Sequence, residues 1–135
     1  MLGRKTYEQD YIDASKKAFN AELAAYRKLA ATGDAAAVKK FEPTYCAHQV
    51  LALEAYFVHR LRGVEGKDGN PCNEVRVIAS SWMENGGVMA ADSQIKLDPA
   101  KSVTGLAVGD KIVIDEKTLT KLAKAYFAEI EARFT

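Results

Sequence analysis

Apolar side chains recur every three or four residues over about residues 7–31, which is the spacing of one face of an α-helix. Charged residues fill the opposite side of this segment. Gly33 follows at the place where a helix commonly ends in a left-handed residue. The members of the stripe are Ile12, Ser15, Phe19, Leu23, Tyr26 and Leu29. We therefore predict an amphipathic helix over about residues 7–31 that packs on a core.

The second periodic segment is apolar on most of its sides. Asp34 can cap a short turn over about residues 35–40. Pro43 fits the first turn of a new helix, because its missing N–H would have no partner there. We predict this helix over about residues 43–62, and a helix with so wide an apolar surface usually lies centrally in its domain or is covered by a partner. Its apolar members are Tyr45, Val50, Leu51, Leu53, Tyr56, Phe57, Val58 and Leu61.

Glycine and proline signals divide the rest of the chain. Residues 63–69 hold three glycines and predict a loop, after which Asn70 and Pro71 combine an N-cap with proline at the first helical position. This third helix should end at about Asn85. Residues 94–97 alternate in polarity and residues 111–114 are β-branched, so they predict a small antiparallel β-pair.

Asp115 caps a final helix with a clean apolar stripe. The fold class predicted is thus mainly α, with four long helices around the central apolar helix over 43–62 and a small antiparallel β-pair before the C-terminal helix. The chain has 135 residues, which fits a single helical domain over residues 1–135.

Composition narrows the classes of partner. A net charge of +1 argues against partners bound by bulk electrostatics, such as nucleic acid or an anionic membrane surface. The chain shows neither the apolar core of a signal peptide nor a run long enough to span a bilayer. Two cysteines are too few for a disulfide scaffold. We expect a cytoplasmic protein with no nucleic-acid partner and no membrane partner.

The polar segment over residues 59–76 is the best candidate site. Cations beside a helix N-terminus commonly hold a phosphate or a carboxylate, and glycines let the backbone approach such a ligand. The candidate anion-binding residues are His59, Arg60, Arg62, Lys67, Asn70 and Asn73. A second interpretation is that the charges neutralise one another, so that the segment only caps one helix and begins the next. The residues available for such pairing are Glu65, Asp68, Glu74, Arg60, Arg62, Lys67 and Arg76. We favour this second interpretation.

The sequence gives weaker support for a metal site, a reactive thiol or a catalytic carboxylate. His48 and His59 share a helix face but lie about 16 Å apart along its axis, too far for one metal ion, so we expect no metal and no cofactor. Cys72 at a helix start could be a reactive thiol, although a buried filler is the commoner role. Glu54 could be a buried carboxylate with a raised pKa or the partner of an arginine from another helix.

The residues His59-Arg60-Leu61-Arg62, Gly66-Lys67-Asp68-Gly69-Asn70-Pro71 and Asn73-Glu74-Val75 form an HRLRxxxGKDGNPxNEV-like segment. In this segment the chain resembles a group of small bacterial proteins of unknown function and similar length. The resemblance implies no activity. It implies that the position of Cys72 is ordinarily aliphatic, and hence that Cys72 fills the core.

Two functions follow from these patterns as hypotheses. The first is a non-catalytic binding or interaction protein that acts as a homodimer, because the wide apolar surface of the helix over 43–62 and the six tyrosines predict an exposed apolar face. The alternative is a protein that binds a small anionic ligand, and is possibly an enzyme, with its site at the 59–76 turn. Whether the protein is an enzyme stays open at this point.

Overall fold

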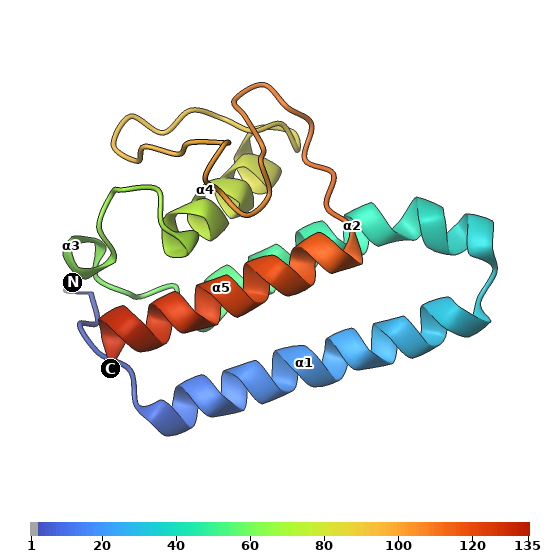
Figure 1. Cartoon of the computed structure of the whole chain (residues 1–135), viewed down its shortest axis with the longest axis horizontal. Coiled ribbons are helices and arrows are strands. Elements are labelled where there is room, and N and C mark those ends of the chain that lie inside the picture. Colours follow the sequence, from blue (N-terminus) through green and yellow to red (C-terminus); the bar gives the residue numbers. More distant parts are fainter. Residues whose placement is uncertain (1–2) are drawn as a thin grey trace.

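The computed structural model describes residues 3–135 and is mainly helical. Its helices are α1 (Gln9–Thr32), α2 (Ala35–Tyr56), α3 (Arg62–Glu65), α4 (Pro71–Glu84) and α5 (Glu116–Phe134). Figure 1 shows α1 and α2 as a long antiparallel hairpin, with α5 running along both and α4 on the side away from α1. Both α2 and α5 pack against each of the other long helices. The centre is therefore a pair of helices rather than α2 alone.

Helix α1 buries the predicted stripe against α2 and α5. Ile12, Phe19 and Leu23 are almost completely buried, whereas Leu29 at the end of the stripe is 67% exposed. Leu29 lies in the last turn of α1, and Figure 1 shows that this end of the α1–α2 hairpin projects beyond α5. The helical period predicted the face of α1 correctly, but it could not show where the neighbouring helix ends.

Helix α2 begins at Ala35, eight residues before the predicted start at Pro43. The Asp34 side chain accepts a hydrogen bond from the N–H of Ala37, so the expected short turn is the first part of this helix. Pro43 lies inside the helix, where it removes only the hydrogen bond to the carbonyl of Lys39, an exposed residue. The strong cap and the well-packed remainder of α2 outweigh this loss.

Helix α2 also ends earlier than predicted, at Tyr56 instead of Arg62. After it, the chain pairs with the N-terminal segment: the N–H of Arg4 donates to the His59 carbonyl over 2.7 Å, and the N–H of Leu61 donates to the Arg4 carbonyl over 2.8 Å. These two bonds use backbone groups that a continuing helix would need. A long-range pairing thus ends a helix whose local pattern runs on.

The predicted β-pair between residues 94–97 and 111–114 does not form over residues 3–135. The only antiparallel bridge in this region joins Val88 to Lys111, and residues 94–97 are irregular. Ile95 is buried, and the N–H of Lys96 donates to the carbonyl of Lys67. Residues 94–97 are therefore attached to the polar turn, and they are not available to the segment before α5.

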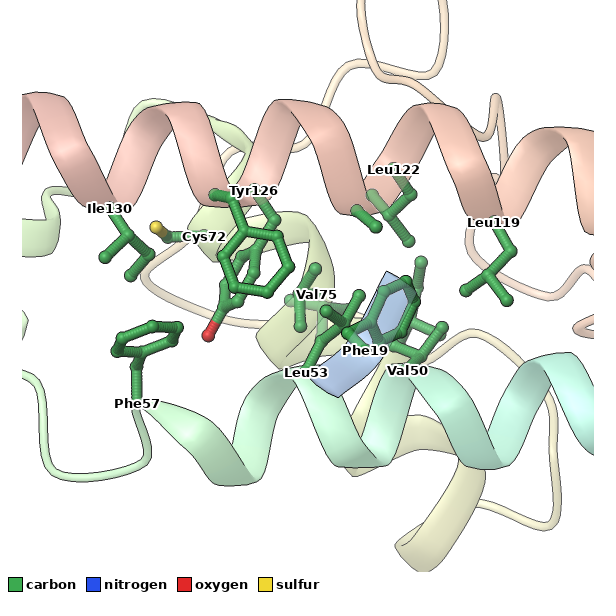
Figure 2. Packing of buried hydrophobic residues seen from close by; sticks show 14 of the residues in the cluster. Phe19, Val50, Leu53, Phe57, Cys72, Val75, Leu119, Leu122, Tyr126 and Ile130 are labelled. Atoms are coloured by element: carbon green, nitrogen blue, oxygen red, sulfur yellow. The ribbon is translucent and has the colours of Figure 1, made fainter. Parts of the chain in front are cut away.

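The shared core lies between α2 and α5 (Figure 2). Its side chains come from all four long helices and are almost completely excluded from solvent. Those labelled in the figure are Phe19, Val50, Leu53, Phe57, Cys72, Val75, Leu119, Leu122, Tyr126 and Ile130. Most of the apolar surface predicted for α2 is thus covered within the chain. Among the helices described over residues 3–135, none has the length and apolar character needed to cross a bilayer.

Candidate functional site

Arg60 lies at the centre of the polar segment, and its side chain is fully buried. Its Nε–H donates to Glu65 Oε1 over 2.8 Å, and its Nη2 donates to Glu54 Oε1 over 2.8 Å. Two charges of opposite sign therefore hold one guanidinium from the two sides. Because a buried cation is stable only when it is paired and hydrogen-bonded, this arrangement explains how an arginine can sit in the core.

The remaining donors of Arg60 are also used. Nη1 donates to the Phe57 carbonyl and to the Tyr126 hydroxyl, over 3.1 and 3.2 Å, and Nη2 donates to the Cys72 carbonyl over 3.0 Å. A guanidinium has five N–H donors, and all five now have a partner from the chain itself. No donor of Arg60 is left for an added anion.

Glu65 is the second centre of this cluster, and its side chain is also fully buried. Arg76 Nη2 donates to Glu65 Oε1 over 2.6 Å, and Asn73 Nδ2 donates to Oε2 over 2.7 Å. Arg76 also lies 3.7 Å from Glu54, which closes a ring of two carboxylates and two guanidinium groups. We call Glu54, Arg60, Glu65 and Arg76 the charge cluster. Its formal charges sum to zero.

The two carboxylates of the charge cluster have pKa values shifted in opposite directions: the pKa of Glu65 is lowered and that of Glu54 is raised. Burial alone would raise the pKa of Glu65, but hydrogen bonds from Arg76 and the charges of Arg60 and Arg76 hold that pKa below its usual value. For Glu54, burial is the largest influence and raises the pKa, against the lowering effect of Arg60. The two acids therefore respond differently to acidification.

Acidification is expected to weaken the fold through Glu65. Because its folded-state pKa is lowered, the stability that its carboxylate adds is fully present above the unfolded-state pKa, about 4.3, and is lost as the pH falls through the folded-state value. Urea unfolding between pH 7 and pH 3 should show this decline, and Glu65→Gln should flatten it. A Glu65→Gln variant with the same pH dependence as the parent would contradict the assignment.

Asn70 builds the turn around the charge cluster. Its Oδ1 accepts the N–H groups of Cys72 and Asn73, and its Nδ2 donates to the Glu65 carbonyl and to Asp68. The predicted N-cap is therefore confirmed. This cap disfavours anion binding at the start of α4, because the N–H groups of Cys72 and Asn73 already donate to Asn70.

Asn73 closes the glycine loop. Its Oδ1 accepts the N–H of Gly69, and its Nδ2 donates to the Gly66 carbonyl as well as to Glu65. Gly66 and Gly69 have φ angles of +80° and +87°, and a Cβ on Gly69 would lie 2.3 Å from the carbonyl oxygen of Lys96. Glycine at position 69 thus allows the close approach of two backbones and does not require a ligand.

The six predicted anion-binding residues fall into two groups. Arg60, Asn70 and Asn73 are buried and meet around Glu65. His59, Arg62 and Lys67 are exposed, and their side chains have no hydrogen bond or ion pair among residues 3–135. An anion at this turn would have to rely on the second group, so the anion-binding hypothesis stays a prediction for those three residues only.

Sequence reasoning misplaced Glu74. It was expected to pair with a cation of the turn, but it is buried and accepts hydrogen bonds from the N–H groups of Val103 and Thr104 and from the Thr104 hydroxyl. It therefore attaches the irregular segment before α5 to α4. Tyr126 lies on the apolar stripe of the final helix, and its hydroxyl accepts a hydrogen bond from Arg60. Helical spacing alone could not reveal either contact.

The cysteines lie in the core. Cys46 and Cys72 are free thiols with no exposed surface, and burial raises the pKa of each to about 12. Both thiols therefore stay protonated near neutral pH, which disfavours nucleophilic chemistry. Within residues 3–135, histidine, cysteine and acidic side chains form no group of three that could hold a metal ion.

Comparisons with known proteins add no relative: no protein-family model, curated protein or solved structure matches this chain. The resemblance of residues 59–75 to small bacterial proteins therefore stays a prediction. What can be said of function rests on the geometry of the chain itself.

Proposed function

We propose that this chain is a non-catalytic interaction protein that acts as a homodimer in the cytoplasm. The observation that carries the proposal is the use of every Arg60 donor by the chain itself, which makes the polar turn a support for the fold. The two buried, unpaired thiols fit a reducing compartment. With the polar turn so occupied, recognition falls to surfaces outside the charge cluster.

The surface that we propose for self-association is a strip on α2, made of Phe41, Tyr45, His48 and Ala52. These residues are spaced by four, three and four positions, so they lie on one helix face. Phe41 is 53% exposed, His48 is exposed, and the other two are partly exposed. We call this face the α2 strip. Tyr45 belongs to the apolar surface predicted for α2, and Phe41 and Ala52 add an exposed and a partly exposed apolar group to the same face.

Neighbouring aromatic rings hold the α2 strip in place. Tyr45 stacks on Tyr26 of α1 with ring centres 4.2 Å apart, and His48 lies against Trp82 of α4 in an edge-on arrangement. The strip is therefore flanked by packed rings on both sides, and side chains in it are already restrained. Restrained aromatic groups lose little conformational freedom on binding, which favours association.

A second copy of the chain is the occupant that suits the α2 strip. The strip contains no lysine, arginine, aspartate or glutamate, and the net charge of the chain is only +1. Two copies can therefore approach without strong repulsion and bury the same face in a two-fold arrangement, which is the commonest symmetry of small oligomers.

Light scattering after size exclusion tests this proposal. The parent is expected to have the mass of a dimer, and Phe41→Glu the mass of a folded monomer, because it places two charges at the two-fold contact. Val108→Glu is the matched control: Val108 is 67% exposed and lies outside the strip, so this variant should stay dimeric. A monomeric parent at working concentration would overturn the proposal.

A further inference from the structure

A cavity of about 360 Å³ lies between residues 4–11 and the end of α2. It exists because the N-terminal segment is bound to the chain after α2 by the two backbone hydrogen bonds of Arg4. In Figure 1 this segment begins beside α3, at the end of the molecule where the C-terminus also lies. The volume of the cavity falls within the range of small-molecule sites, about 300–1,000 Å³. None of its lining residues belongs to the charge cluster or to the α2 strip.

Three tyrosines form the apolar walls of this cavity, namely Tyr7, Tyr11 and Tyr56. Tyr7 and Tyr11 are stacked with ring centres 5.9 Å apart, and the Tyr11 hydroxyl donates to the Tyr56 carbonyl over 2.6 Å. Tyr7 is only 7% exposed and packs edge-on against Phe57 at 4.9 Å. The walls are thus fixed by contacts within the chain, so a flat ring can bind without reorganising them.

Polar and charged side chains also line the same cavity. Arg4 and His59 lie on it together with one acid, Glu8. The guanidinium of Arg4 is 5.2 Å from the centre of the Tyr7 ring. None of the three makes a side-chain hydrogen bond or ion pair within the described part of the chain, residues 3–135. Their donors are therefore open to a bound group, in contrast with those of Arg60.

We propose that this cavity binds a small, flat aromatic carboxylate, with its ring against the tyrosines and its carboxylate on Arg4 and His59. A guanidinium fork matches the two oxygens of a carboxylate. A single negative charge suits the cavity better than the double charge of a phosphate monoester, because Arg4 is the one arginine or lysine among the described lining residues and no second permanent cation balances a second charge. Tyr7 contributes its ring only, since its hydroxyl is buried without a partner among residues 3–135.

Titration with phenylacetate, followed by amide NMR shifts, tests the proposal. We expect saturable shifts at residues 4–11 and 55–59, and weaker binding of three comparison probes: cyclohexylacetate, whose ring is neither flat nor aromatic, 2-phenylethylamine, which carries the opposite charge, and phenyl phosphate. Absence of saturable shifts at these residues would overturn the proposal. Tighter binding of the amine would overturn the assignment of a carboxylate.

Substitutions test whether phenylacetate binds in this cavity or at another surface. Arg4→Gln should weaken phenylacetate binding about tenfold or more, because it removes a charged hydrogen-bond donor. Ala55→Trp should abolish binding by filling the cavity, and Ala24→Trp, at another exposed helical alanine, should leave it unchanged. Unchanged binding in both Arg4→Gln and Ala55→Trp would place the ligand elsewhere and overturn the proposal, whatever the oligomeric state.

Discussion

Arg60→Met is expected to lower the free energy of unfolding by about 3–5 kcal/mol, the usual cost of removing one partner from a buried charge pair. The methionine can fill most of the space, but Glu54 and Glu65 then share one remaining cation, Arg76. The carbonyls of Phe57 and Cys72 also lose a donor. Urea denaturation at neutral pH measures the change directly.

Arg62→Met is the matched control for this prediction. Arg62 lies two residues away and is exposed, and its side chain makes no hydrogen bond or ion pair with the charge cluster in the described part of the chain. The Arg62→Met variant should have a urea midpoint close to that of the parent. Adding Glu65→Leu to Arg60→Met should cost less than the two single changes summed, because the second substitution removes a carboxylate that the first has left unpaired. Equal midpoints for Arg60→Met and Arg62→Met would contradict the structural role of Arg60.

Phe57→Ala is expected to destabilise the protein by about 3–5 kcal/mol as well, through a different cause. Phe57 is fully buried and its ring meets those of Tyr7, Tyr126 and Phe127. Figure 2 shows it between α2 and α5, near Ile130. Truncation would leave a cavity that these fixed rings cannot fill by collapsing. A fall in the thermal midpoint should be accompanied by loosening of the N-terminal segment, which hydrogen exchange can detect.

The neighbouring residue supplies the control. Val58 is 48% exposed, so Val58→Ala should leave the thermal midpoint almost unchanged. A Phe57→Ala variant as stable as Val58→Ala would show that the ring cluster does not hold the N-terminal segment to α2 and α5.

The starts of α4 and α5 could be predicted from the sequence because their capping chemistry is local, whereas α2 begins eight residues before its predicted start. Asp34, Asn70 and Asp115 each cap a helix with a side chain that accepts an N–H group within three residues. Helix ends were harder to predict from the sequence. Val58 and Leu61 continue the apolar pattern of α2, yet the chain leaves the helix at Phe57 to pair with Arg4, which is over fifty residues away in the sequence.

The polar turn could be interpreted only in part. Opposite charges close in the sequence predicted that the segment neutralises itself, and the Arg60–Glu65 pair confirms that idea at its centre. Glu54 was expected to be a buried carboxylate with a raised pKa or the partner of an arginine from another helix, and it both has a raised pKa and lies beside Arg76 of α4. No local pattern could name Tyr126 of α5 as a partner of Arg60. The predicted β-pair is not confirmed: residues 94–97 are irregular, and the N–H of Lys96 donates to the Lys67 carbonyl of the polar turn, a partner that no local pattern could name.

The most direct test of the structural role of the polar turn is the NMR signal of the Arg60 Nε–H group. A guanidinium with every donor engaged and no solvent exposure should keep a slowly exchanging Nε–H, and this signal should not move when phosphate or phenylacetate is added. The exposed Arg62 should exchange rapidly under the same conditions. A rapidly exchanging Arg60 signal, or one that shifts in proportion to bound phosphate, would contradict the structural role and make the turn an anion site.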